Sequence, residues 1–234
     1  MSLLTKRYST ILSLIFIVVF IVIAYFSYNQ NKREEMKEDQ MELNNPLDNQ
    51  GTTYLMKMAQ EGDWVRVKEA LKREANPHAT DKYNQTALSH AVSWNQPEVV
   101  KLLLDAGANP DIVRNDGFTP LMIAILENKA EIANILIDRG ANIHIQDNDA
   151  NDALHHAVSR YLHGFPSPEI VQKLIELGTD VNRANKYGHT PLLHAMEDKN
   201  TNMIELLKEH GAVVPKDSKI KLVHKPIKNK DDKF

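Results

Sequence analysis

The 234-residue chain is predicted to be all-α: a solenoid of paired antiparallel helices with β-turn or hairpin fingers, preceded by one transmembrane helix. A short core, Thr-x-Leu or Asp-x-Leu, begins at positions 86, 119, 152 and 190, at steps of 33, 33 and 38 residues. Apolar runs that end in glycine at positions 107, 140, 178 and 211 keep the same register. Two markers that share one period and one insertion indicate stacked structural units rather than a single central core.

Within each unit the pattern predicts two short helices and a polar turn. The first helix starts at the core, where Pro120 and Pro191 suit the first helical turn because proline lacks the N–H that would be unpaired there. The second helix starts near Glu98, Glu131 and Glu169, whose charge suits a helix N-terminus. It ends at the glycine, which tolerates the left-handed conformation of a helix cap.

The stretch that runs Asp116-Gly117-Phe118-Thr119-Pro120-Leu121, with Ala124 in the alanine place, resembles the T-P-L-H-x-A signature of ankyrin repeats. That family has a 33-residue unit made of a β-turn and two helices. Extending the register backwards adds a first unit that starts at Asp48. The resemblance therefore implies five units over residues 48–214, bounded as 48–80, 81–113, 114–146, 147–184 and 185–214.

Two of these units depart from the pattern. The first has Met58 at the motif alanine and Glu74 at the helix-ending glycine, as expected of a terminal capping unit. The fourth has Ala150 at the turn glycine, which predicts a distorted turn, and five extra residues within 162–168. The insertion is either ordinary loop variation between two helices or a segment that makes a contact specific to this protein through Phe165.

The N-terminal region predicts a membrane anchor. Residues 8–31 carry no charge, and about 20 apolar residues are enough to cross a bilayer as a helix. We therefore predict a tail over residues 1–7, a transmembrane helix or signal anchor over 8–28 in contact with the lipid bilayer, and a polar tether over 29–47. A cleaved signal peptide is the alternative, but its apolar part is usually shorter and is followed by a small-x-small cleavage site.

The charges beside this segment bear on its orientation. Basic residues flank it on both sides in nearly equal number, so the positive-inside rule gives little preference. A short basic segment ahead of the first apolar stretch is typical of a signal anchor, which would put the repeats outside the cytoplasm, in the periplasm of a Gram-negative bacterium. Residues 215–234 form a basic tail, with seven lysines and three aspartates, which is either solvated or docked on the last unit.

The sequence gives little support to a catalytic function. It has no cysteine, so a thiol nucleophile is excluded, and it has no glycine-rich phosphate loop. The ten histidines are predicted to have structural roles or to lie on the surface. His155 occupies the histidine place of the ankyrin motif, which is a hydrogen-bonding position in that family. We expect no enzyme activity, no cofactor, no metal and no small-molecule substrate. Nucleic acid is also an unfavourable partner because the repeats are acidic overall.

The resemblance implies a protein partner, bound by the turn tips and by the outward side of the first helix of each unit, on the concave face. Aromatic residues and arginine are enriched at such interfaces, although an aromatic side chain here could instead pack on a neighbouring turn. The predicted partner-binding residues are Tyr83, Gln85, Trp94, Asn115, Asp116, Phe118, Glu127, Asn148, Asn151, Arg160, Lys186, Tyr187 and His189.

Anchor and repeats together predict a protein-binding module that recognises or inhibits a partner at the cell envelope. Neutralisation of a toxin, the role of an immunity protein, is one setting that matches. The alternative is a scaffold or adaptor that faces the cytoplasm from the membrane.

Overall fold

The computed structural model describes residues 20–34, 42–159 and 168–215. Within these ranges the chain forms helices and turns, without a strand, so the fingers of the predicted fold are turns rather than hairpin ladders. The repeat region contains α2 (Tyr54–Glu61), α3 (Trp64–Lys72), α4 (Ala87–Ser93), α5 (Pro97–Asp105), α6 (Pro120–Leu126), α7 (Ala130–Asp138), α8 (Ala153–Val158), α9 (Pro168–Glu176), α10 (Pro191–Glu197) and α11 (Thr201–Glu209).

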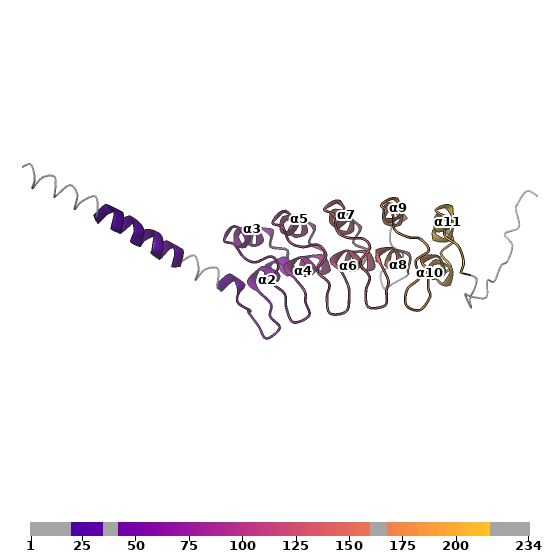
Figure 1. Cartoon of the computed structure of the whole chain (residues 1–234), viewed down its shortest axis with the longest axis horizontal. Coiled ribbons are helices and arrows are strands. Elements are labelled where there is room, and N and C mark those ends of the chain that lie inside the picture. The colour runs from indigo at the N-terminus through magenta and orange to yellow at the C-terminus, as the bar shows by residue number, and fades with distance from the viewer. Residues whose placement is uncertain (1–19, 35–41, 160–167, 216–234) are drawn as a thin grey trace, which may run out of the picture.

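These helices form two parallel rows (Figure 1). The even-numbered helices α2 to α10 make the inner row, and the odd-numbered helices α3 to α11 lie above them as the outer row. Each first helix packs on its own second helix and on the first helix of the next unit. The turns project from the inner row on the side away from the outer helices. The structure is therefore an open stack, in which each pair contacts its neighbours along the row.

The inner helices begin at capping side chains, as the core motif predicts. Thr119 Oγ1 accepts a hydrogen bond from Met122 N at 3.2 Å, and Thr190 Oγ1 accepts one from Leu193 N at 3.3 Å. In the fourth unit Asp152 replaces threonine and caps α8 equally well, because its Oδ1 accepts from the backbone N–H of the second and third helical residues. Such caps satisfy N–H groups that have no partner inside the helix.

The outer helices end at left-handed residues. Gly107 follows α5 with φ 83°, and Ala108 N then donates to Leu103 O at 2.9 Å, which closes the helix. The glycines at 140, 178 and 211 have the same conformation. In the first unit Glu74 takes this place with φ 61°, so the backbone geometry is kept without glycine.

The turns share one backbone hydrogen bond, from the N–H of the first turn residue to the carbonyl of the fifth. In the second unit the side chain of the first residue reinforces the turn. Asp81 Oδ1 accepts from Tyr83 N and Gln85 N, both at 2.8 Å. The distortion predicted for the fourth turn is absent. Ala150 adopts φ 61° in place of glycine, and Asp147 N still donates to Asn151 O at 2.9 Å. The sequence change is accommodated by strain at one residue, not by a change of turn shape.

The core lies between the two rows of helices. Leu103, Leu136, Leu174 and Leu207 are completely buried. The adjacent apolar residues, namely Leu102, Ile135, Ile175 and Leu206, are partly buried and pack against the core from the outer row. This alternation is what a helix with one apolar side produces.

The N-terminal part adds a helix over residues 20–34. Where the structure is described, no helix has both the length and the apolar character needed to cross a bilayer. Residues 8–19 of the predicted transmembrane segment lie outside the described part. So do Arg160, Phe165 and the tail from residue 216 onward.

Candidate functional site

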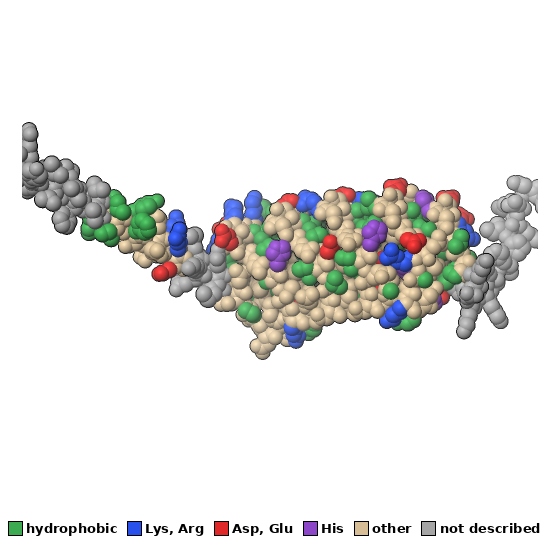
Figure 2. Space-filling model, viewed as in Figure 1, with side chains coloured by type: hydrophobic (Ala, Val, Ile, Leu, Met, Phe, Trp, Pro, Cys, Tyr) green, Lys and Arg blue, Asp and Glu red, His purple; other side chains and the backbone are tan. Residues whose placement is uncertain are grey.

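The turns and the inner helices that follow them present one continuous side of the stack, which we call the turn face. It comprises residues 81–85, 114–118, 147–151 and 185–189 together with the ends of α4, α6 and α10. In Figure 2 charged side chains gather over the outer helix row, whereas the turns below show mostly uncharged surface. The turns, which carry most of the predicted partner-binding residues, therefore lie on the less charged side of the molecule in this view.

Three of the predicted aromatic residues are well exposed on the turn face. The exposed fraction is 49% for Tyr83, 57% for Trp94 and 64% for Tyr187. Trp94 is the C-cap of α4, and the two tyrosines lie in turns. Exposed aromatic rings that are not used by the core are available for contact with another molecule.

Each exposed tyrosine follows a lysine that covers its ring. Lys82 Nζ lies 4.9 Å from the Tyr83 ring centroid, and Lys186 Nζ lies 5.0 Å from that of Tyr187. Tyr187 Oη also donates to Asp149 Oδ1 at 3.2 Å. The pKa of Lys186 is raised by its hydrogen bond to Asp149. These contacts hold the rings in place before any partner arrives, which lowers the entropy cost of binding.

The polar tip residues connect one turn to the next. Asn115 N donates to Tyr83 O at 3.1 Å, and Asn115 Nδ2 donates to Lys82 O at 3.0 Å. Asn148 Nδ2 reaches Asn115 O at 3.4 Å. Both asparagines remain exposed, so they stiffen the row of turns and still present polar atoms to solvent.

Other predicted residues are used mainly inside the stack. The Phe118 ring lies 5.2 Å from the ring of His156 in the next unit. Asn151 Oδ1 accepts from Asn185 Nδ2 at 2.8 Å. Glu127 pairs with Lys129, whose Nζ donates to the last carbonyls of α4. Phe118 and Asn151 connect neighbouring units directly, and Glu127 does so only through Lys129. For Phe118 this is the packing role considered from the sequence.

The remaining predicted residues are less constrained by the stack. Gln85 and His189 are half-buried at the end of their turns. Asp116 is exposed, and its Oδ2 lies 2.9 Å from Arg114 Nη2. The structure does not describe Arg160.

Buried histidines behind the turns make structural pairs. His155 Nδ1 lies 2.8 Å from Asp152 Oδ1 at the start of α8, which bears out the structural role predicted for it. His156 Nε2 lies 2.9 Å from Asp147 Oδ2. Burial alone would raise the pKa of Asp147, but hydrogen bonds from His156 and Asn151 outweigh it and hold the pKa well below the usual range.

One cluster was missed by sequence reasoning. His189, His194 and Glu197 bring potential metal-ligand atoms within 4.8 Å of one another. Only His189 belongs to the predicted site. His194 and Glu197 are one helical turn apart on α10, a spacing that could have signalled a shared side, but no sequence pattern placed His189 beside them.

Comparison with known proteins agrees with this architecture. The family model described as "Ankyrin repeats (3 copies)" matches residues 23–114, 55–149, 106–184 and 154–231. The chain therefore belongs to the ankyrin-repeat family, and its repeats form a protein–protein interaction module. Proteins of this family are typically not enzymes.

Two curated relatives share a short segment with the chain. They are the proteins named potassium channel AKT1 from Oryza sativa subsp. indica and from Oryza sativa subsp. japonica. Each is 48% identical over 48 residues, which is 20% of this chain and 5% of the channel. The matched region is too small a part of either channel to carry its activity over to this chain.

Proposed function

We propose that the chain is a membrane-anchored module that binds a protein partner at the cell envelope through the turn face, and inhibits that partner as an immunity protein does. The observation that carries the proposal is the set of exposed aromatic rings at Tyr83, Trp94 and Tyr187. The two tyrosines lie among polar turn tips that are already held in place, and Trp94 lies at the C-terminal end of α4. Aromatic anchors surrounded by polar groups are characteristic of protein interfaces.

Rigid presentation supports this assignment. Each tyrosine is fixed by a lysine over its ring, and its turn is linked sideways to the preceding turn. A partner that docks on such a surface orders few side chains, so more of the contact free energy is retained as affinity. A stack of turns also offers a long contact surface, which suits a folded protein better than a small molecule.

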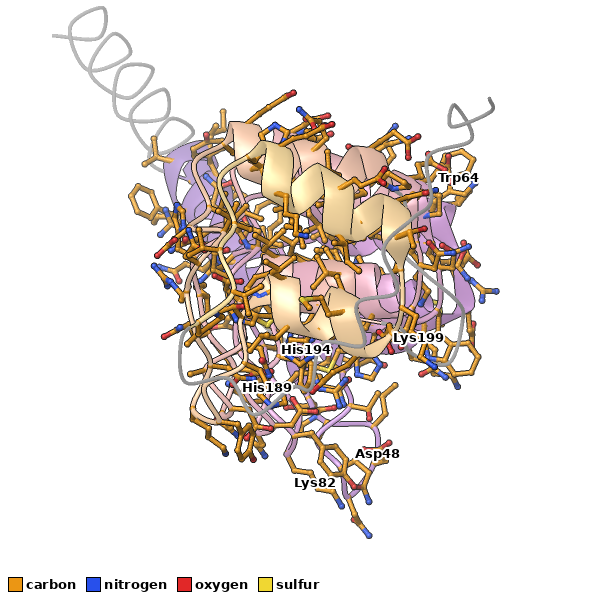
Figure 3. All side chains as sticks on the ribbon, turned by 90° about the vertical axis from the view of Figure 1, so that its right-hand side faces the viewer. Asp48, Trp64, Lys82, His189, His194 and Lys199 are labelled. Carbon is orange, nitrogen blue, oxygen red and sulfur yellow. The ribbon has the colours of Figure 1, made fainter. Side chains whose placement is uncertain are left out.

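The experiment compares partner capture by two variants of the full-length protein. Tyr83→Ala/Trp94→Ala/Tyr187→Ala removes the exposed rings of the turn face. Trp64→Ala removes a tryptophan of similar exposure, 52%, which Figure 3 places at the level of the outer helices and away from the turns. After crosslinking in cells, the triple variant is expected to lose the partner that the wild type and Trp64→Ala both retain.

Circular dichroism establishes that the triple variant is folded before capture is compared. If the folded triple variant retains the same partner at the same yield, the turn face is not the binding surface. If Trp64→Ala alone loses the partner, the outer helices are the contact surface instead.

Residues 8–28 are proposed as the anchor because their apolar length matches a bilayer. We expect the full chain to stay in the membrane fraction after alkaline carbonate extraction, and a chain that lacks residues 1–28 to be released. A reporter fused after Phe234 that is active only outside the cytoplasm would support the extracytoplasmic orientation. A reporter active only in the cytoplasm would favour the scaffold role.

The inhibitory role is tested separately from binding. If the captured partner is a toxin or an envelope enzyme, its activity is expected to fall on addition of the wild type and to be unaffected by the triple variant. Binding without loss of the partner's activity would leave an adaptor and exclude an immunity protein.

A further inference from the structure

The position of His194 is occupied by histidine in three of the described units, but its surroundings change in the last one. In the second unit His90 Nε2 lies 3.4 Å from Asp81 Oδ2, and in the fourth His156 Nε2 lies 2.9 Å from Asp147 Oδ2. Each carboxylate comes from the first residue of that unit's turn. In the last unit this turn residue is Asn185.

Asn185 cannot replace the missing carboxylate because its side chain is already used. Its Oδ1 accepts from Tyr187 N at 2.9 Å and from His189 N at 3.0 Å, and its Nδ2 donates to Asn151. His194 Nε2 is buried and makes no hydrogen bond. His90 Nε2 makes none either, but it lies beside the carboxylate of Asp81, whereas the corresponding turn residue of the last unit offers His194 no carboxylate. A buried polar nitrogen without a partner is costly, so this atom is a candidate for binding something from outside the chain.

Two further donors lie beside His194 in place of the aspartate. Its ring centroid is 5.3 Å from that of His189, with the planes at 70°. Glu197 is one turn further along α10, and its Oε2 lies 3.8 Å from His189 Nδ1. One ligand atom from each of the three residues falls within 4.8 Å of the others. Figure 3 shows His189 and His194 next to each other below α10, where the last turn meets the helix.

We propose that His189, His194 and Glu197 bind a divalent transition metal, with Zn²⁺ as the ion that fits this donor set best. Two imidazoles and one carboxylate are a known zinc ligand set that leaves a fourth position open. Tetrahedral zinc with bonds of about 2.0–2.2 Å needs ligand atoms about 3.3 Å apart. The side chains of His189 and Glu197 are 39% and 43% exposed, so both can rotate inward, and water can take the fourth position.

A neighbouring ring fixes the orientation of His194. The ring of His155, which is bonded to Asp152, stands at 83° to His194 with 6.1 Å between centroids. It packs against the metal-binding ring and helps to fix its orientation.

The other described units show which residues can replace the three proposed ligands, since none of these units has the same three donors at the corresponding positions. The positions of His189, His194 and Glu197 correspond to Asn151, His156 and Ser159 in the fourth unit, and to Phe118, Ile123 and Leu126 in the third. Test variants can therefore be His189→Asn, His194→Ile and Glu197→Ser, each placing a residue that the same fold already carries at that register position.

The test uses the full-length chain in mild detergent, freed of metal with a chelator and titrated with zinc chloride by calorimetry. The wild type is expected to bind one equivalent. Each single substitution should weaken binding at least tenfold, and His189→Asn/Glu197→Ser should abolish it. His144→Asn, which changes an exposed histidine outside the cluster, should bind as the wild type does. Titration with cobalt(II) should give a tetrahedral visible spectrum that the double variant lacks.

Circular dichroism shows whether the variants are folded. The side chains of His189 and Glu197 are only partly covered, so substitutions there keep the test valid if His194→Ile does not fold. A wild type that binds no zinc, or a folded double variant that binds it with unchanged stoichiometry and affinity, would overturn the proposal.

Discussion

At the scale of single residues, the backbone of the described stack bends at fourteen left-handed positions, eight of them glycine. Ala150 is an exception in a turn, with φ 61°. The left-handed region costs an L-residue roughly 1–2 kcal/mol because Cβ approaches the following carbonyl oxygen. Glycine avoids that cost but loses more chain entropy on folding, so the two effects oppose each other at this position.

We expect Ala150→Gly to raise the free energy of unfolding by about 1 kcal/mol, because relief of strain exceeds the entropy loss. Urea denaturation measures the change. Gly140→Ala is the matched control, since Gly140 has φ 81° and an added Cβ would meet no atom within 4 Å. It should lose stability by a similar amount. If both substitutions destabilise the protein, the strain at Ala150 is not significant.

The lowered pKa of Asp147 leads to a second prediction, which concerns how the stability of the fold depends on pH. Its pKa in the folded chain lies below the ordinary value of 3.8, so folding favours the charged form. The stabilisation is therefore present above about pH 4 and is lost as the pH falls further, when the unfolded chain takes up the proton first. We expect Asp147→Asn, which copies Asn185 of the last unit, to lose less stability than the wild type between about pH 5 and 2.

Chemical denaturation at several pH values measures this effect. At pH 7 the variant should be less stable than the wild type, because His156 loses its charged partner. Parallel pH profiles for the two proteins would show that Asp147 does not titrate with a lowered pKa.

At the scale of the elements, close packing of adjacent turns is the feature most open to test. A Cβ built on Gly117 would lie 2.6 Å from Asn148 N in the next turn, whereas one on Gly188 would meet no atom within 4 Å. Both residues have positive φ, 90° and 79°, so alanine strains the backbone in both. The difference between the two substitutions isolates contact between turns.

Gly117→Ala is therefore expected to cost about 1–3 kcal/mol more than Gly188→Ala, the usual range for overpacking. Equilibrium unfolding in urea gives both values. An equal loss of stability in the two variants would mean that the third and fourth turns can move apart without penalty. The turn face would then be less rigid than its hydrogen bonds indicate.

The elements also show what the sequence could predict. Helix starts at Thr119 and Thr190 and helix ends at Gly107 depend on local chemistry, so short motifs predict them. Whether Phe118 faces a partner or packs on His156 depends on a residue of the next unit, and no local pattern contains that information. The surroundings of His194 are similar, because they depend on the turn residue Asn185, which stands where the second and fourth units have aspartate, and on the fold of that turn.

At the scale of the whole molecule, an open stack shares its stability between neighbours, so the effect of a core change depends on its place in the row. Leu136 on α7 and Leu207 on α11 are both completely buried. The pair α6–α7 packs against units on both sides, whereas α10–α11 is the last helix pair described and joins the stack mainly through α8.

Truncation of either leucine to alanine should cost roughly 2–5 kcal/mol locally, but the two losses should spread differently. Leu136→Ala is expected to lower the global free energy of unfolding, since both flanking interfaces depend on α7. Leu207→Ala should instead let α10 and α11 open while α2 to α7 stay folded. Hydrogen exchange read by mass spectrometry distinguishes them: faster exchange throughout the repeats for the first, and confined to residues 185–214 for the second. Faster exchange throughout the repeats in Leu207→Ala would show that the last pair is as tightly coupled to the stack as the middle ones.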